Sequence, residues 1–188
     1  MITLTLYTMK KVHSWILVTT LFLAGYLPAK ALSDSFPQPH RSANQLFYIQ
    51  RSKDINTIVY EANLSANKKL DPNKPLQVYW IRYAEKGQRE DLSPIQWQMA
   101  YGYTHKPSTA GPDAYDINLN AFRKHPLQVV RYQGKPIAMT LINGERARLQ
   151  KVFVQLDPKS RLVPHVQYIE MYGVDLDKGK PVYERIIP

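Results

Sequence analysis

The chain of 188 residues is long enough for one ordinary domain with a hydrophobic core, and it carries a net charge of +10. It contains no cysteine, which excludes disulfide bonds, a thiol nucleophile, thiolate zinc sites and iron–sulfur clusters. The clearest basic clusters are short: Lys68-Lys69, Arg123-Lys124-His125 and Arg146-x-Arg148. None has the length of a nucleic-acid-binding arm. We therefore expect no nucleic-acid partner, whereas a mildly basic surface suits anionic lipids, cell-wall polymers or acidic glycans.

Residues 1–31 have the pattern of a secretory signal peptide. The pair Lys10-Lys11 precedes an apolar run over Trp15–Leu27, and the small-residue site Ala29-Lys30-Ala31 follows. We expect cleavage after Ala31 and a translation start at Met9. The apolar run is shorter than the ~20 residues that a spanning helix needs. The sequence therefore predicts an exported bacterial protein, periplasmic or extracellular, with no stable membrane span in the mature chain.

Residues 32–42 are polar and contain two prolines, which predicts an extended leader. Residues 43–188 predict a single β-rich domain, because apolar and polar side chains alternate with period two in many short segments. Two examples are the faces Ile58/Tyr60/Ala62/Leu64 and Leu76/Val78/Trp80/Arg82. Strands are expected at 45–51, 57–64, 76–84, 114–122, 127–133, 136–143, 146–157, 165–174 and 182–187.

One short helix is expected in the middle of the chain. Ser93 is a suitable N-cap, Pro94 suits the first helical position, and Gly102 lies where a helix-ending glycine is common. These signals predict a helix from Pro94 to about Tyr101, followed by a loop over 104–113. Asn143-Gly144 between two alternating segments predicts a β-hairpin. The expected fold class is all-β, mainly antiparallel: a barrel-like or sandwich domain of about 8–9 strands with one short helix.

Four segments resemble an uncharacterised family of exported bacterial proteins, the domain of unknown function 4833. They are Leu46–Ser52 (LFYIQRS), Asn56–Asn63 (NTIVYEAN), Val78–Tyr83 (VYWIRY) and Ala100-Tyr101-Gly102. The resemblance spans about Phe36 to the C-terminus. It implies a signal peptide and a single domain, and it supplies no activity, substrate or catalytic residue.

No motif assigns a catalytic residue, a cofactor or a metal. The histidines after the leader are isolated, without the close spacing of metal ligands. Asp175-x-Asp177-x-Gly179 begins like a calcium loop, but the glycine and the terminal acid of such a loop are replaced by Lys180 and Ile186. The nucleophile elbow, the phosphate-binding glycine loop and the dinucleotide fingerprint are missing from the sequence.

Arg82 is the most informative candidate for ligand binding, because it shares its expected face with Leu76, Val78 and Trp80. A buried guanidinium needs a carboxylate partner, and we expect Glu61 first and Glu170 second. Two interpretations stay open. The pair could be a structural plug at a barrel end, or it could bind an anionic headgroup.

Aromatic side chains complete the candidate binding set. Tyrosine joins an apolar ring to a hydrogen-bonding hydroxyl, which suits a ligand cavity, although aromatic residues also simply favour strands. The set is Arg82, Glu61, Tyr79, Trp80, Tyr101 and His105, the last because it falls in the expected long loop. The predicted function is an exported, non-catalytic β-domain that binds a small amphipathic or anionic envelope ligand or a surface partner. The alternative is an envelope-acting hydrolase or transferase. A hollow interior favours a binding cavity, and a filled interior favours a scaffold.

Overall fold

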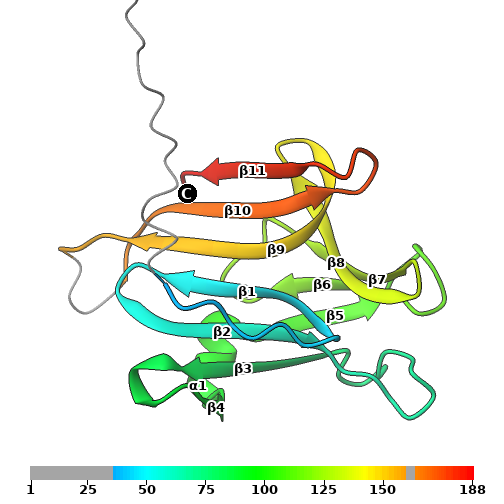
Figure 1. Cartoon of the computed structure of the whole chain (residues 1–188), viewed down its shortest axis with the longest axis horizontal. Coiled ribbons are helices and arrows are strands. Elements are labelled where there is room, and N and C mark those ends of the chain that lie inside the picture. The colour runs from blue at the N-terminus through cyan, green and yellow to red at the C-terminus, as the bar shows by residue number, and fades with distance from the viewer. Residues whose placement is uncertain (1–35, 160–163) are drawn as a thin grey trace, which may run out of the picture.

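A computed structural model describes residues 36–159 and 164–188 (Figure 1). The expected signal peptide and the first residues of the leader lie outside this part. The described elements are β1 (Gln45–Arg51), β2 (Asp54–Ala62), β3 (Leu76–Arg82), η2 (Tyr83–Glu85), β4 (Gln88–Asp91), α1 (Pro94–Gln96), η3 (Trp97–Tyr101), β5 (Tyr103–Pro107), β6 (Tyr115–Leu119), β7 (Leu127–Tyr132), β8 (Lys135–Ile142), β9 (Glu145–Leu156), β10 (Val166–Asp175) and β11 (Pro181–Ile186). None of the helices in these ranges is long and apolar enough to cross a membrane.

The strands form one curled sheet with the shape of a half-barrel (Figure 1). The order is β4-β3-β2-β1-β9-β8-β7-β6-β5, and β10 pairs with β9 and carries β11. The described pairings are antiparallel apart from that of β1 with β9, which is parallel. The mainly antiparallel β-fold expected from the sequence is confirmed, but the sheet is mixed.

Strand β9 changes partner along one of its edges. Its first half pairs with β8, and its second half, from Lys151 onward, pairs with β1. On the other edge the register against β10 slips at the same place: Tyr172 lies opposite Lys151, whereas Gly173 lies opposite Leu149, so Gln150 is an extra residue. Such a bulge bends a strand and increases its twist. The bend lets β1 and β8 leave β9 in diverging directions.

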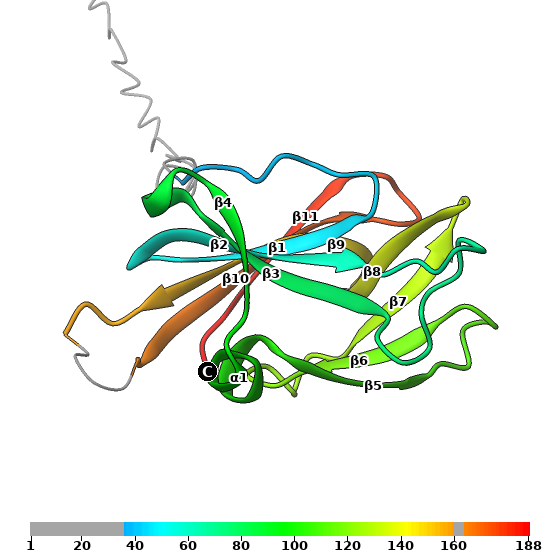
Figure 2. The same cartoon turned by 90° about the horizontal axis from the view of Figure 1, so that it is seen from below.

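The two diverging arms form separate layers, one containing β1–β3 and the other β5–β8 (Figure 2). Their facing surfaces make the core, because each strand turns its apolar side inward. Phe47, Tyr60 and Trp80 from one layer and Ile117 and Leu127 from the other are at most 2% exposed. The expected inward faces of β2 and β3 are therefore confirmed, except that Arg82, the last residue of the β3 face, is not part of the core. The interior is filled with side chains rather than hollow.

The short helix is confirmed as α1 followed by η3, which has π-helical geometry. The Ser93 hydroxyl accepts a hydrogen bond from the Gln96 backbone, and the Gln96 side chain accepts one from the Ser93 backbone, which makes a capping box. Gly102 follows the helix as expected, although its backbone is extended rather than left-handed. Glycine is needed there for space, because a Cβ would lie 2.3 Å from the Trp97 carbonyl oxygen.

Two strands were not expected from the sequence. β4 is exposed at all four residues, so it has no apolar alternation that would reveal it. β5 occupies the beginning of the expected loop over 104–113 and forms the edge of the second layer. The prediction of a loop at 104–107 was therefore wrong, while the nine expected strands are all present with small shifts at their ends.

Tyr103 of β5 connects this edge to the first layer. The Tyr103 hydroxyl donates to the Leu76 carbonyl oxygen at 2.8 Å and accepts from the Leu76 backbone N–H at 3.0 Å. Burial raises the pKa of Tyr103 to about 12, so the hydroxyl keeps its proton. It therefore satisfies two buried backbone groups at once.

Replacing Gly173 with alanine should destabilise the fold by about 1–3 kcal/mol, the usual cost of inserting atoms into a packed core. The new Cβ would lie 2.7 Å from both the Arg148 carbonyl oxygen and Ile142 Cδ1. Gly111→Ala is the control, because nothing lies within 4 Å of its Cβ position. Urea unfolding checks this, and equal midpoints for the two variants would contradict the close approach at the bulge.

Tyr103→Phe should lower the free energy of unfolding by about 1–3 kcal/mol, because two buried backbone groups of Leu76 lose their partner. Tyr115→Phe is a matched control, since Tyr115 is similarly buried and its hydroxyl has no hydrogen bond to another described residue. Thermal and urea melts measure the difference. A loss no greater than that of the control would show that the hydroxyl does not join the layers.

Candidate functional site

The structure divides the six sequence-derived candidates among four places. Arg82 lies at the end of β3, where the strand leaves the core, and its side chain is one quarter exposed. Its guanidinium pairs with Glu85 at 2.5 Å and with Glu90 at 3.3 Å. The expected pairing with Glu61 or Glu170 was therefore wrong. The local hairpin supplies both carboxylates, so Arg82 is not an internal plug.

Glu61 and Tyr79 do lie together, on the outer face of the first layer. The Tyr79 hydroxyl is 3.2 Å from a Glu61 carboxylate oxygen, and burial beside this carboxylate raises the pKa of Tyr79 to about 12. The Arg89 guanidinium stacks 3.6 Å from the centre of the Tyr79 ring and pairs with Glu61 at 3.8 Å. The Ser42 hydroxyl also donates to Glu61. The Glu61 carboxylate is thus occupied by neighbours of its own chain.

Trp80 and Tyr101 also meet, with ring centroids 5.3 Å apart in an edge-to-face arrangement. The Arg51 guanidinium lies 5.1 Å from the Trp80 ring and 5.6 Å from the Tyr101 ring, and it pairs with Asp54. Because Trp80 is only 2% exposed, this cluster joins the helix to the core rather than presenting a surface for a ligand.

His105 lies in strand β5 and not in a long loop. Its ring is 5.9 Å from the rings of both Tyr103 and Tyr115, and Nε2 is 3.0 Å from the Pro72 carbonyl oxygen. Within residues 36–159 and 164–188, no group of three or more His, Asp or Glu side chains could hold a metal ion.

Glu170, the second expected partner of Arg82, is instead bound to Arg185 at 2.6 Å. The hydroxyls of Tyr172 and Tyr183 each donate to it at 2.8 Å. Burial works to raise the pKa of Glu170, but the hydrogen bonds from Arg185 and the two tyrosines outweigh it and lower the pKa. The carboxylate is therefore ionised and its hydrogen bonds are made within the cluster.

A different location gathers cationic side chains for which the described residues supply no ion-pair partner. We call it the fork cleft: two adjoining cavities of about 420 and 190 Å3 at the place where β1 and β8 separate from β9. The two share Arg41, Gln45 and Leu46 in their walls. Lys135 and Arg148 line the larger cavity together with Arg41, and neither cavity has a carboxylate in its lining.

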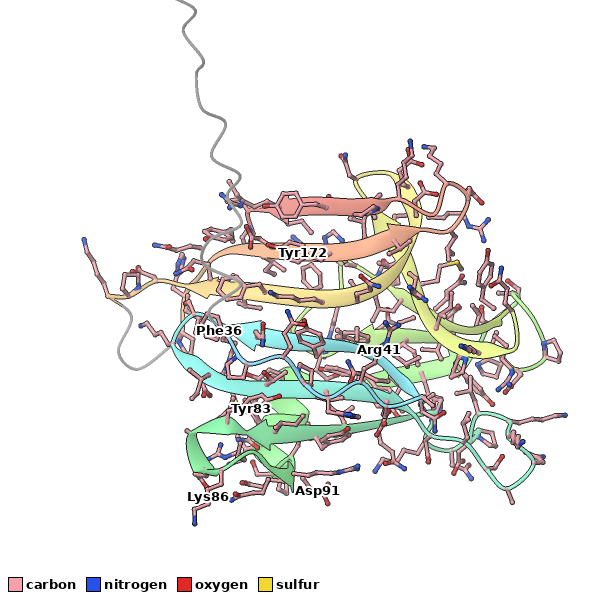
Figure 3. The ribbon with its side chains drawn as sticks, viewed as in Figure 1. Phe36, Arg41, Tyr83, Lys86, Asp91 and Tyr172 are labelled. Atoms are coloured by element: carbon pink, nitrogen blue, oxygen red, sulfur yellow. The ribbon has the colours of Figure 1, made fainter. Side chains whose placement is uncertain are left out.

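The fold explains why these cations meet. Lys135 begins β8 after a tight turn at Gln133-Gly134, where both residues have positive φ. Arg148 is the last residue of β9 that pairs with β8, and its neighbours Ala147 and Leu149 face the core. Arg41 belongs to the N-terminal strap, residues 36–44, which crosses the outer face of β1 and β2 (Figure 3). Arg41, Lys135 and Arg148 form no ion pair in the described part of the chain.

Apolar side chains complete the larger cavity. Leu46, Pro136 and Ile137 lie in its wall beside the three cations. The cleft thus combines positive charge with an apolar surface, which is the lining that an amphipathic anion needs. Sequence analysis missed it because its residues are far apart in the chain; the cluster Arg146-x-Arg148 was the one signal that touched it.

Comparison with known families assigns no activity or ligand to the chain. The profile of a family described as "Domain of unknown function (DUF4833)" matches residues 47–185. The chain therefore belongs to this family, as the sequence resemblance suggested. No curated protein and no solved structure matches the chain.

Arg82→Ala should cause only a small loss of stability, because both of its partners are surface carboxylates and exposed pairs contribute little. Glu170→Ala should lower the urea midpoint clearly more, because it leaves the Arg185 guanidinium and two tyrosine hydroxyls without their acceptor. Parallel urea melts measure both. A larger loss for Arg82→Ala would restore the buried-pair interpretation.

Proposed function

We propose that this protein is an exported, non-catalytic binding domain that holds a small amphipathic anion in the fork cleft. The observation that carries the proposal is that Arg41, Lys135 and Arg148 line one cavity and have no carboxylate partner among the described residues. Elsewhere the charged candidates are neutralised by neighbours, as for Arg82 and Glu170.

The filled interior supports a surface site. The space between the two layers is occupied by large side chains such as Phe47, Tyr60 and Trp80. A ligand held inside the half-barrel would have to displace them, which would cost the core its packing. A cleft at the seam between two layers needs no such rearrangement. It is also a common position for ligand sites, because the chain leaves concave space where elements diverge.

The chemistry of the lining favours an anion with an apolar part. Guanidinium and ammonium groups donate strong hydrogen bonds to oxyanions, while Leu46, Pro136 and Ile137 offer apolar area to a short chain. Export rests on the signal-peptide pattern in residues 1–31. An envelope lipid or an acidic polymer fragment is a ligand of this kind.

The test uses n-octyl sulfate and neutral n-octyl glucoside, both below their micelle concentrations. Calorimetric titration should detect binding of the sulfate and little of the glucoside. The double variant Arg41→Gln/Lys135→Gln should weaken sulfate binding by about tenfold or more, because each charge-assisted hydrogen bond contributes about 1.5–3 kcal/mol.

The matched control is Arg123→Gln/Lys124→Gln, which also removes two positive charges. These residues lie in an exposed turn before β7, whereas Lys135 lies after that strand. It should leave the affinity nearly unchanged. Equal binding of the two amphiphiles by the unaltered protein, or an equal loss in the control variant, would refute an anion site in the fork cleft.

A further inference from the structure

The fork cleft is built from two parts of the chain that are held together differently. One wall consists of sheet residues, including Lys135 and Arg148. The other wall is the N-terminal strap, which contributes Arg41 to both cavities and Pro39 to the smaller one. Without the strap in place, the cleft would lose a wall and one of its three cations.

The strap is anchored at both ends. Near its start, the Phe36 ring packs on the Phe153 ring with centroids 5.6 Å apart, and the Pro37 carbonyl accepts a hydrogen bond of 2.8 Å from the Gln50 side chain. Near its end, the Asn44 carbonyl accepts from the Ala62 backbone at 2.9 Å. Figure 3 shows Phe36 and Arg41 at separate points along the strap.

Arg41 itself is exposed, and its neighbour Ser42 donates a hydrogen bond to Glu61. Residues 38–41 make no backbone hydrogen bond to the sheet in the described structure. Gln50, which holds the strap through Pro37, is only 1% exposed, so this anchor is a buried and ordered group. Phe36 and Gln50 line neither cavity. They hold the start of the strap that carries Arg41 from outside the cleft lining.

Three cations in one cavity suit a group with more than one negative charge. A phosphate monoester carries a charge of about −1.5 to −2 at neutral pH, and its three terminal oxygens accept several hydrogen bonds. Guanidinium groups match phosphate oxygens in pairs, and lysine adds a point charge. A carboxylate or a sulfate ester, with a single charge, would leave part of this positive charge uncompensated.

Resting on the function proposed above, we propose that the ligand of the fork cleft is a phosphate monoester with an apolar tail, clamped between the strap and the sheet. The phosphate joins Arg41 on the strap to Lys135 and Arg148 on the sheet, and the tail lies against Leu46 and Ile137. Because the bound phosphate contacts both walls, ligand binding stabilises the docked strap. By thermodynamic reciprocity, strap docking then strengthens ligand binding by the same factor.

The ligand class is tested with three probes: n-octyl phosphate, n-octyl sulfate and inorganic phosphate. Calorimetry should show octyl phosphate binding about tenfold tighter than octyl sulfate, and inorganic phosphate binding more weakly than octyl phosphate. Equal affinity for octyl sulfate would overturn the phosphate class while leaving the proposed anion site intact. Equal affinity for inorganic phosphate would overturn the apolar tail and identify free phosphate as the ligand. No binding of any anionic probe would overturn the proposed function itself.

The clamp is tested by trypsin, which can cleave after Arg41, the sole lysine or arginine of the strap. Saturating octyl phosphate should slow this cleavage severalfold, whereas cleavage after the exposed Lys124 should keep its rate. Mass spectrometry of the fragments separates the two sites. An unchanged rate at Arg41 in protein that binds the probe would overturn the clamp and leave the anion site standing.

Phe36→Ala should weaken octyl phosphate binding severalfold and speed cleavage after Arg41, although Phe36 touches no part of the cleft lining. Phe36→Trp, which keeps an aromatic ring on Phe153, should restore both. The control is Phe122→Ala, which removes a partly buried ring that stacks on His125 away from the strap. If Phe36→Ala melts like the unaltered protein and binds octyl phosphate with unchanged affinity, the strap does not position Arg41.

Discussion

The structure depends on one strand having two partners along the same edge. β9 pairs first with β8 and then with β1, and the bulge at Gln150 lies between the two pairings. Because a bulge bends and twists the strand, the sheet divides into two arms that can close over a common core. Gly173 on β10 permits the bend, since any side chain there would collide with the Arg148 carbonyl and Ile142.

Closure of the arms determines where the molecule has concave space. The facing surfaces fill the interior, and Tyr103 joins the free edge of the second layer to Leu76 of the first. The interior between the two layers is therefore packed with side chains, and concave space is left at the seam where the arms part. The same bulge that allows the core to form produces the fork cleft at its side.

The cations discussed above fall into two kinds. Arg82 and Arg185 each meet a carboxylate on an adjacent strand, and Arg89 meets one two strands away, so their charge is used within the fold. Arg41 and Lys135 lie at the seam, where the described lining of the cleft contains no carboxylate. Leaving cations unpaired beside a concave, partly apolar wall gains nothing for folding. In the proposed function, a bound anion supplies the missing negative charge.

The sequence by itself determined the local structure. Alternation with period two located nine strands, and Ser93, Pro94 and Gly102 located the helix, because these signals act over neighbouring residues. β4 was missed because it is charged and exposed on both faces. The parallel pairing of β1 with β9, the partners of Arg82 and the fork cleft were decided only by tertiary structure. These three features bring together residues that are separated in the chain by a turn, a bulge or about a hundred positions. No local sequence pattern indicates which strands will lie side by side.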